Sequence, residues 1–251
     1  MTSSMIYADK PYNISDPELI ERGYFRLDIG GDYTKNNDHK EFVKIPDFGA
    51  RFGLGLVEIG VHFSGVYIND TESYEDYDRG DLYISTKFSI LCERKLLPCI
   101  SILSEVKVPT AANQRKIGTD ETDYFLKFLA MKRFENSRIN IEAGLEVLGD
   151  PETNQSQNDG FIYGIMGEYN LTNNFRAAAE FYGDFIEGRR NTAFISGILL
   201  YKLKNNFEIY AGGRKGLNRK TDDWGCYLGL GYSFDINNLL ECSSNFESDL
   251  N

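Results

Sequence analysis

Few residues in this chain have the type and spacing needed for catalysis or metal binding. It contains two histidines, His39 in a polar stretch and His62 in an alternating stretch, and four cysteines. A hydrolase would need a histidine beside a nucleophilic serine and an acidic partner, and nothing in the sequence places such a set near either histidine. No pair of histidines or cysteines has metal-ligand spacing, and no glycine-rich loop suits a phosphate. The sequence therefore predicts no enzyme, no metal site and no cofactor.

Charged side chains stand out instead, because they recur within otherwise apolar segments. The stretch from Trp224 to Phe234 shows the underlying pattern, with large apolar residues on one face and small or polar residues on the other. This period of two is typical of a β-strand. The dry core of a sandwich could hold so many charges only if nearly all were paired, so we interpret the polar face as the lining of a barrel lumen. The predicted lining residues are Arg26, Asp28, Arg51, Glu58, His62, Lys87, Glu105, Lys107, Lys127, Glu142, Glu146, Glu168, Arg176, Glu180, Glu208 and Arg214.

These residues lie in about twelve segments with alternating apolar and polar residues. They cover residues 24–33, 48–54, 57–67, 82–90, 100–108, 124–130, 139–147, 161–169, 175–181, 193–201, 207–214 and 224–234. Connections after odd-numbered segments are long and polar, as at 109–121, whereas those after even-numbered segments are short, as at 172–174. The pattern predicts an all-β fold, an up-and-down antiparallel transmembrane β-barrel with short periplasmic turns and long extracellular loops.

A soluble, lipocalin-like barrel is the alternative, because alternation alone does not distinguish the inside of a barrel from the outside. Two features favour the polar lumen. Aromatic residues lie near the segment ends, as in membrane-interface girdles, and the strand number exceeds what a small apolar-filled barrel needs.

Composition sets further bounds. The 251 residues carry a formal net charge of −11, which disfavours nucleic-acid binding. No run approaches the roughly 18 apolar residues of a spanning helix. We expect three parts: an N-terminal segment at 1–22, the barrel at 23–234 and a polar tail at 235–251.

The N-terminal segment raises two expectations. Residues 1–8 resemble the end of a signal peptide, so the natural start of the protein is hypothesised to lie upstream, although an ordinary cytosolic N-terminus is the alternative. The remainder is expected to be a periplasmic lead-in with one helical turn, since Ser15 and Glu18 have capping-box spacing.

Two further predictions concern residues at strand ends. Cys92 and Cys99 flank a predicted turn between neighbouring strands, so they are candidates for a disulfide in the oxidising periplasm; two unpaired thiols are the alternative. Phe234 ends the last strand, which is expected to pair with the first strand and to present a terminal aromatic to the barrel-assembly machinery.

Several short motifs resemble the outer-membrane family named for the MetA pathway of phenol degradation, often labelled "transporter". They are Lys10-Pro11-Tyr12, Asp16-Pro17, Gly23-Tyr24-Phe25, Gly80-Asp81-Leu82, 106–110 (VKVPT), Asp123-Tyr124, 169–172 (YNLT) with Glu180, and 229–234 (GLGYSF). The resemblance implies a β-barrel in the bacterial outer membrane that passes small hydrophobic or aromatic compounds.

A passive channel surrounded by outer-membrane lipid is therefore the function expected from the sequence, with a small hydrophobic solute as its cargo. The alternative is a closed structural or adhesion barrel whose lumen is filled by ion pairs. A soluble lipid-binding barrel is a third possibility.

Overall fold

The computed structural model describes residues 10–36, 40–70, 74–111, 117–118, 120–149, 157–186, 191–203, 206–218 and 221–236. They form thirteen strands. These are β1 (Tyr24–Lys35), β2 (Glu41–Gly53), β3 (Val57–Asp70), β4 (Tyr74–Arg79), β5 (Leu82–Leu91), β6 (Cys99–Val108), β7 (Asp123–Arg133), β8 (Ser137–Gly149), β9 (Gln157–Asn170), β10 (Phe175–Ile186), β11 (Thr192–Lys202), β12 (Phe207–Gly216) and β13 (Trp224–Asp235). His39, residues 1–8 and the tail from 237 onward lie outside the described residues.

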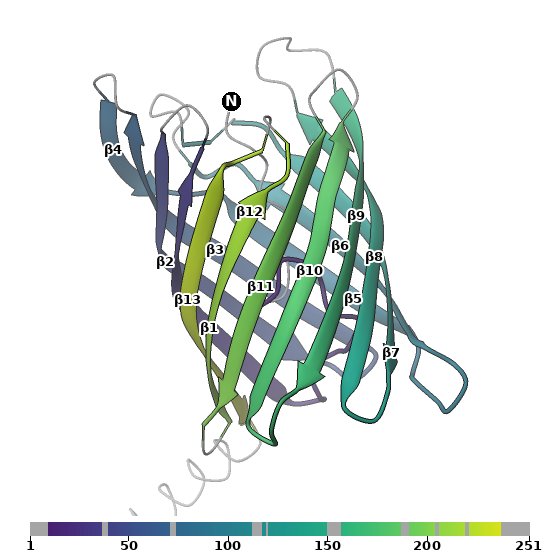
Figure 1. The fold of residues 1–251 in the computed structure, drawn as a ribbon. Helices are drawn as coiled ribbons and strands as arrows, with labels where there is room; N and C mark the ends of the chain where they lie inside the picture. Colours follow the sequence, from purple (N-terminus) through teal and green to yellow (C-terminus); the bar gives the residue numbers. More distant parts are fainter. Residues whose placement is uncertain are drawn as a thin grey trace, which may run out of the picture.

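Antiparallel pairing closes the sheet into a barrel (Figure 1). The last strand pairs with the first along its whole length, with Phe234 opposite Phe25 and Trp224 opposite Lys35. The predicted closing strand is thereby confirmed. The connections β2–β3, β5–β6, β7–β8, β9–β10 and β11–β12 lie at one end, here called the turn rim. The other connections lie at the opposite loop rim, except that between β4 and β5, which lies part-way along β3.

The wall contains twelve strands, and β4 is an additional one. β4 pairs with the loop-rim end of β3, from Gly65 to Asp70. β5 pairs with the turn-rim part of the same strand, from Val57 to His62. The chain passes from β4 to β5 through Gly80 and Asp81. Residues 74–79 lie between the predicted segments 57–67 and 82–90, in what was expected to be a long polar connection.

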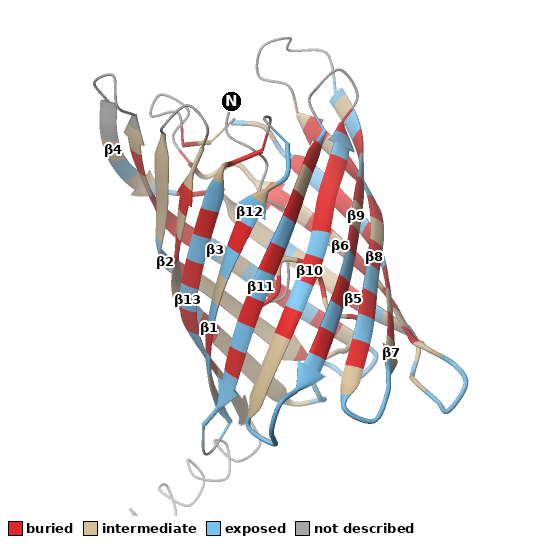
Figure 2. Ribbon diagram, viewed as in Figure 1, coloured by how far each residue is buried: buried red, intermediate tan, exposed pale blue. Residues whose placement is uncertain are grey.

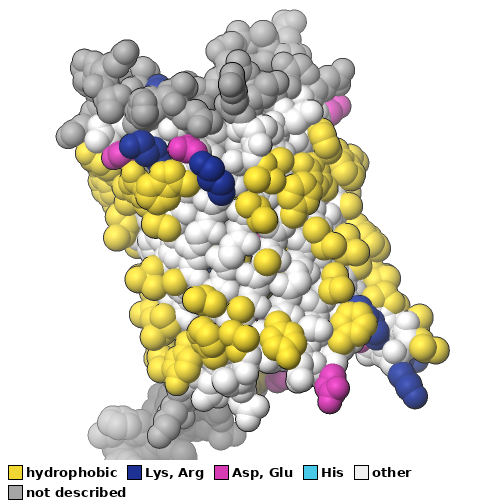
Figure 3. All heavy atoms as spheres, in the orientation of Figure 1, with side chains coloured by type: hydrophobic (Ala, Val, Ile, Leu, Met, Phe, Trp, Pro, Cys, Tyr) yellow, Lys and Arg dark blue, Asp and Glu magenta, His cyan; other side chains and the backbone are white. Residues whose placement is uncertain are grey.

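Exposure identifies the two faces of the wall. Along β7 to β11 and most of β13, exposed and buried residues alternate with few breaks (Figure 2). Outward residues are mostly large and apolar, such as Phe128, Leu145 and Leu228. On the face seen in Figure 3, hydrophobic side chains gather in an upper and a lower band. This arrangement is that of a membrane barrel and contradicts the soluble lipid-binding alternative, whose apolar face would point inward.

Aromatic side chains are concentrated in these bands. At the turn rim the ring of Phe25 stacks on Phe52 at 4.4 Å and lies 5.6 Å from Phe234, and Phe207 stacks on Tyr232 at 4.2 Å. At the loop rim the rings of Tyr33 and Trp224 lie 5.2 Å apart. In the described part of the chain no helix is long and apolar enough to cross a membrane, a finding that has no bearing on strands.

Candidate functional site in the lumen

The lumen holds all sixteen of the predicted lining residues. Eleven are buried, and the remaining five, Arg26, Arg51, His62, Arg176 and Glu208, are half-buried. Buried charged residues that the sequence analysis did not select join them on the inner face: Asp32, Asp47, Asp123, Arg138 and Asp184. Asp47 and Arg138 come directly before the predicted segments 48–54 and 139–147, so extending the alternation by one residue would have included them.

Residues 10–22, here called the lumen segment, also lie inside the barrel. Three backbone N–H groups donate hydrogen bonds to wall carboxylates: Asn13 to Glu180 at 2.9 Å, Ser15 to Glu142 at 2.8 Å and Ile20 to Glu58 at 2.7 Å. These acceptors belong to β10, β8 and β3, so the segment follows the wall around much of the lumen. The lumen segment was expected to be a periplasmic lead-in, and in the structure it occupies part of the lumen.

The predicted helical turn at Ser15–Glu18 does not form. The carboxylate of Asp16 accepts a hydrogen bond from the backbone N–H of Glu18 at 3.0 Å, a local side-chain bond that competes with helix formation. The hydroxyl of Ser15 is instead 3.5 Å from the Lys127 ammonium, and the carbonyl of Pro17 accepts a 2.6 Å bond from Ser101. Contacts to the wall therefore decide the conformation here.

A near-continuous chain of ion pairs runs around the lumen close to the turn rim. In order along the wall its members are Lys87 on β5, Glu58 on β3, Arg51 on β2, Asp28 and Arg26 on β1, Glu208 on β12, Arg176 on β10, Glu168 on β9 and Arg138 on β8. We call these nine side chains the charge ring. Successive N–O distances range from 2.5 Å for Arg176–Glu208 to 3.9 Å for Arg51–Glu58. Cations and carboxylates alternate throughout, so each buried charge has neighbours of opposite sign.

The lumen segment completes the charge ring. Nη1 of Arg138 lies 2.7 Å from the Asp16 carboxylate, and Nζ of Lys87 donates to the Glu18 carbonyl at 3.3 Å. The Tyr12 hydroxyl contacts both Arg138, at 2.8 Å, and Glu168. The segment is thus held by charge-assisted hydrogen bonds, which are stronger than neutral ones.

Glycines on β13 make room for two ion pairs that cross this strand. A Cβ on Gly231 would collide with Nη2 of Arg26, and one on Gly225 would lie 3.0 Å from Nε of Arg214. Arg26 and Arg214 can therefore extend over β13, Arg26 to reach Glu208 on β12 and Arg214 to reach Asp32 on β1. The small inner face of the last strand is explained by these neighbours.

Gly53 lies in close contact with the backbone at the end of the lumen segment. A Cβ on Gly53 would collide with the carbonyl oxygens of Ile20 and Glu21. We expect Gly53→Ala to lower the free energy of unfolding by about 1–3 kcal/mol, because backbone must shift. Urea titration of the barrel in lipid vesicles would measure the loss. The matched control is Gly197→Ala, where the added Cβ meets no atom within 4 Å and stability should be unchanged. Equal stability of the two variants would contradict the close approach.

His62 lies in a second ion cluster, nearer the middle of the lumen. Its Nε2 is 2.6 Å from one oxygen of Asp47, and the other oxygen is 2.7 Å from the Lys10 ammonium. His62 was predicted to line the lumen, and its partner there is Asp47. In the described part of the chain no three metal-binding side chains gather.

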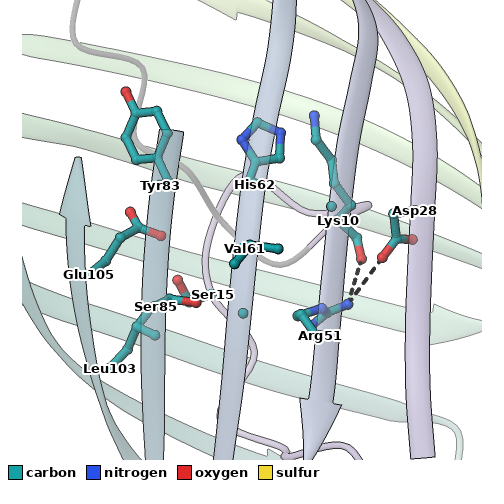
Figure 4. Close-up of a pocket in the computed structure, with 12 residues that line it drawn as sticks. Lys10, Ser15, Asp28, Arg51, Val61, His62, Tyr83, Ser85, Leu103 and Glu105 are labelled. Carbon is teal, nitrogen blue, oxygen red and sulfur yellow. Dashed lines mark hydrogen bonds and ion pairs between the residues drawn. The ribbon is translucent and has the colours of Figure 1, made fainter. Parts of the chain in front are cut away.

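Two of the cavities lined by described residues lie beside the lumen segment. The mid-lumen cavity, about 40 Å³, is lined by residues that include Asp28, His62, Tyr83 and Glu105 (Figure 4). The arginine cavity, about 240 Å³, is lined by Arg26, Arg51, Arg138 and Arg176, together with other residues of the wall and of the lumen segment. Lys10 and Arg51 line both cavities, and Nη2 of Arg51 lies 3.5 Å from the Lys10 carbonyl (Figure 4). The Arg51–Lys10 contact therefore lies between the two spaces.

The disulfide predicted between Cys92 and Cys99 is not formed. Cys99 is buried, and its Sγ lies 3.7 Å from the Pro17 carbonyl in the lumen. Cys92 is exposed, and its Sγ lies 3.9 Å from the hydroxyl of Ser89. Both thiols are free. The pairing of β5 with β6 ends at Leu91 and Ile100, and beyond it the two thiols lie on different sides of the wall, with Cys99 buried and Cys92 exposed.

Comparisons with known proteins agree with this architecture. A family model described as "Putative MetA-pathway of phenol degradation" matches residues 8–236. The COG4313 outer membrane channel from Pseudomonas putida F1 is similar in structure, with a TM-score of 0.68, 12% sequence identity, and coverage of 87% of this chain and 98% of that one. The NanC porin aligns with a TM-score of 0.60 and 10% identity over 82% of this chain and 98% of that one. No curated protein sequence matches the chain.

Proposed function

Because the chain belongs to the family described as the putative MetA-pathway of phenol degradation, we propose that it is a bacterial outer-membrane channel for small molecules. The observation that carries the proposal is a closed barrel with an apolar exterior and a charged lumen in which two cavities remain beside the lumen segment. A wall of this kind suits a surrounding bilayer and a polar passage. No chemical step is required.

The solutes proposed are small and apolar or aromatic, and they cross by passive diffusion. Two features support this class: the family description refers to phenol, and Pro11, Tyr12, Leu19 and Ile20 give the arginine cavity an apolar side. The Arg51–Lys10 contact between the two cavities would limit the size of the solute. Outer-membrane lipid would contact the apolar bands, and the barrel-assembly machinery would recognise the terminal Phe234.

A closed structural barrel is the second candidate, and the charge ring favours it. Ion pairs and the lumen segment occupy much of the cross-section near the turn rim. On this alternative the lumen is a rigid polar core, and the loops make the functional contacts.

Uptake by proteoliposomes distinguishes the two. Labelled phenylalanine is a suitable probe because it is small and aromatic, and its zwitterion crosses lipid slowly. We expect uptake above that of empty liposomes, together with a small conductance in planar bilayers. Uptake equal to that of empty liposomes, with heat-modifiable migration showing that the barrel is folded, would refute the channel and leave the structural barrel.

A further inference from the structure

We propose that the arginine cavity is a binding site for small organic anions, namely a carboxylate attached to an apolar or aromatic body. The proposal rests on the proposed channel function and names a solute class for it. Its basis is the charge, the shape and the accessibility of one cavity.

Cations outnumber carboxylates among the side chains that line the cavity. The lining cations are Lys10, Arg26, Arg51, Arg138 and Arg176, and the lining carboxylates are Asp16, Glu18 and Glu208. The same cations also pair with Asp28, Asp47, Glu58 and Glu168, which do not line the cavity, so these pairs hold the guanidinium groups in place. Guanidinium groups match the planar geometry of a carboxylate and bind it through two parallel hydrogen bonds.

The charge ring also binds carboxylates that do not belong to the wall. Its nine members are five cations and four carboxylates. Two further carboxylates come from the lumen segment and lie near Arg138, Asp16 at 2.7 Å and Glu18 at 3.5 Å. A guanidinium group of the wall, that of Arg138, thus already binds carboxylates of the lumen segment. A solute carboxylate would meet the same guanidinium chemistry at Arg26 and Arg176, which both pair with Glu208.

The apolar side of the cavity fits the rest of such a solute. Pro11, Tyr12, Leu19 and Ile20 line it, and the guanidinium of Arg138 lies 5.3 Å from the centre of the Tyr12 ring. A volume of about 240 Å³ is below the roughly 300 Å³ at which pockets for drug-sized ligands begin. The geometry points to a solute with a single ring.

Arg176 is the most accessible of the four arginines. Its side chain retains 27% of its exposed surface, compared with 15% for Arg26, 14% for Arg51 and 9% for Arg138. It lies at the second residue of β10, next to the turn rim. We therefore expect a solute at this end of the barrel to meet Arg176 first.

Equilibrium dialysis of the full-length, folded protein tests the site with labelled benzoate. Benzamide is the neutral counterpart, because it has nearly the same shape without the charge. We expect saturable benzoate binding that excess benzamide does not displace. Arg176→Gln should weaken benzoate binding by at least about tenfold, since it removes a charge-assisted pair. Lys215→Gln is the matched control, because this exposed lysine on β12 lies near the loop rim and does not line the cavity.

Each outcome decides the proposal. Benzoate binding no tighter than benzamide binding, or binding unchanged in Arg176→Gln and in Arg26→Gln, would overturn it. If neither variant shows heat-modifiable migration, the comparison of benzoate with benzamide on the unaltered protein decides. Phenylalanine uptake without benzoate binding would refute only the anion site, whereas benzoate binding without uptake would refute only the channel.

Discussion

Deleting residues 10–20 should raise the single-channel conductance by about an order of magnitude, because a wall of twelve strands encloses more space than its own side chains fill. In the intact chain this stretch lies against β10, β8 and β3 and borders both cavities. Its removal would join the two cavities into one passage. Planar-bilayer recordings in potassium chloride would measure the change.

Neutralising the acidic residues of the same segment is the milder, matched test. Asp16→Asn with Glu18→Gln removes the charges that face Arg138 and Arg133 while keeping the length of the chain. We expect brief openings of intermediate conductance, because the hydrogen bonds made by backbone groups of Asn13, Ser15 and Ile20 remain. If the deletion variant migrated as a folded barrel and conducted no better than the intact chain, the segment would not be what narrows the lumen.

The architecture of the wall could be predicted from the sequence because a membrane barrel imposes a strict local rule. Each residue of a strand faces either the apolar exterior or the polar lumen, so the order of the side chains reveals the fold. In β13 the inward positions are glycines because the side chains of Arg26 and Arg214 lie over them. All sixteen predicted lining residues are buried or half-buried for the same reason.

The contents of the lumen could not be predicted in this way. Residues 10–22 have no periodic pattern, and their partners lie far away in the sequence: Asn13 binds Glu180 and Asp16 binds Arg138. Such contacts depend on which strands face one another after closure. The local signal at Ser15–Glu18 indicated a helical turn, but bonds from Ser15 to the wall replace it.

Ion pairs that fill the lumen were one alternative offered by the sequence, but their partners could not be named from it. Most pairs join neighbouring or next-neighbouring strands along the wall, as in Lys107–Asp123 at 2.5 Å and Lys87–Glu58 at 3.2 Å. Register decides these partners, and a shift of one residue would change every one of them.

Removing one partner of a buried pair should have the largest effect on stability. Arg214 lies 2.7 and 2.6 Å from the two oxygens of Asp32, and both side chains are 6% exposed. We expect Arg214→Met to lower the free energy of unfolding by about 3–5 kcal/mol, because it leaves the Asp32 carboxylate buried without its main counter-charge. Urea titration in lipid vesicles, followed by the fluorescence of Trp224, would measure the loss, since Trp224 is the only tryptophan.

The next residue along β12 provides the matched control. Lys215 also pairs with an aspartate, Asp223, but these side chains are 58% and 41% exposed. Exposed pairs contribute little, so Lys215→Met should cost less than about 1 kcal/mol. The double variant Arg214→Met with Asp32→Asn should recover part of the loss, because no uncompensated charge then stays buried. If Arg214→Met and Lys215→Met were equally stable, burial of the ion pairs would not be what makes the lumen charges so sensitive to loss of a partner.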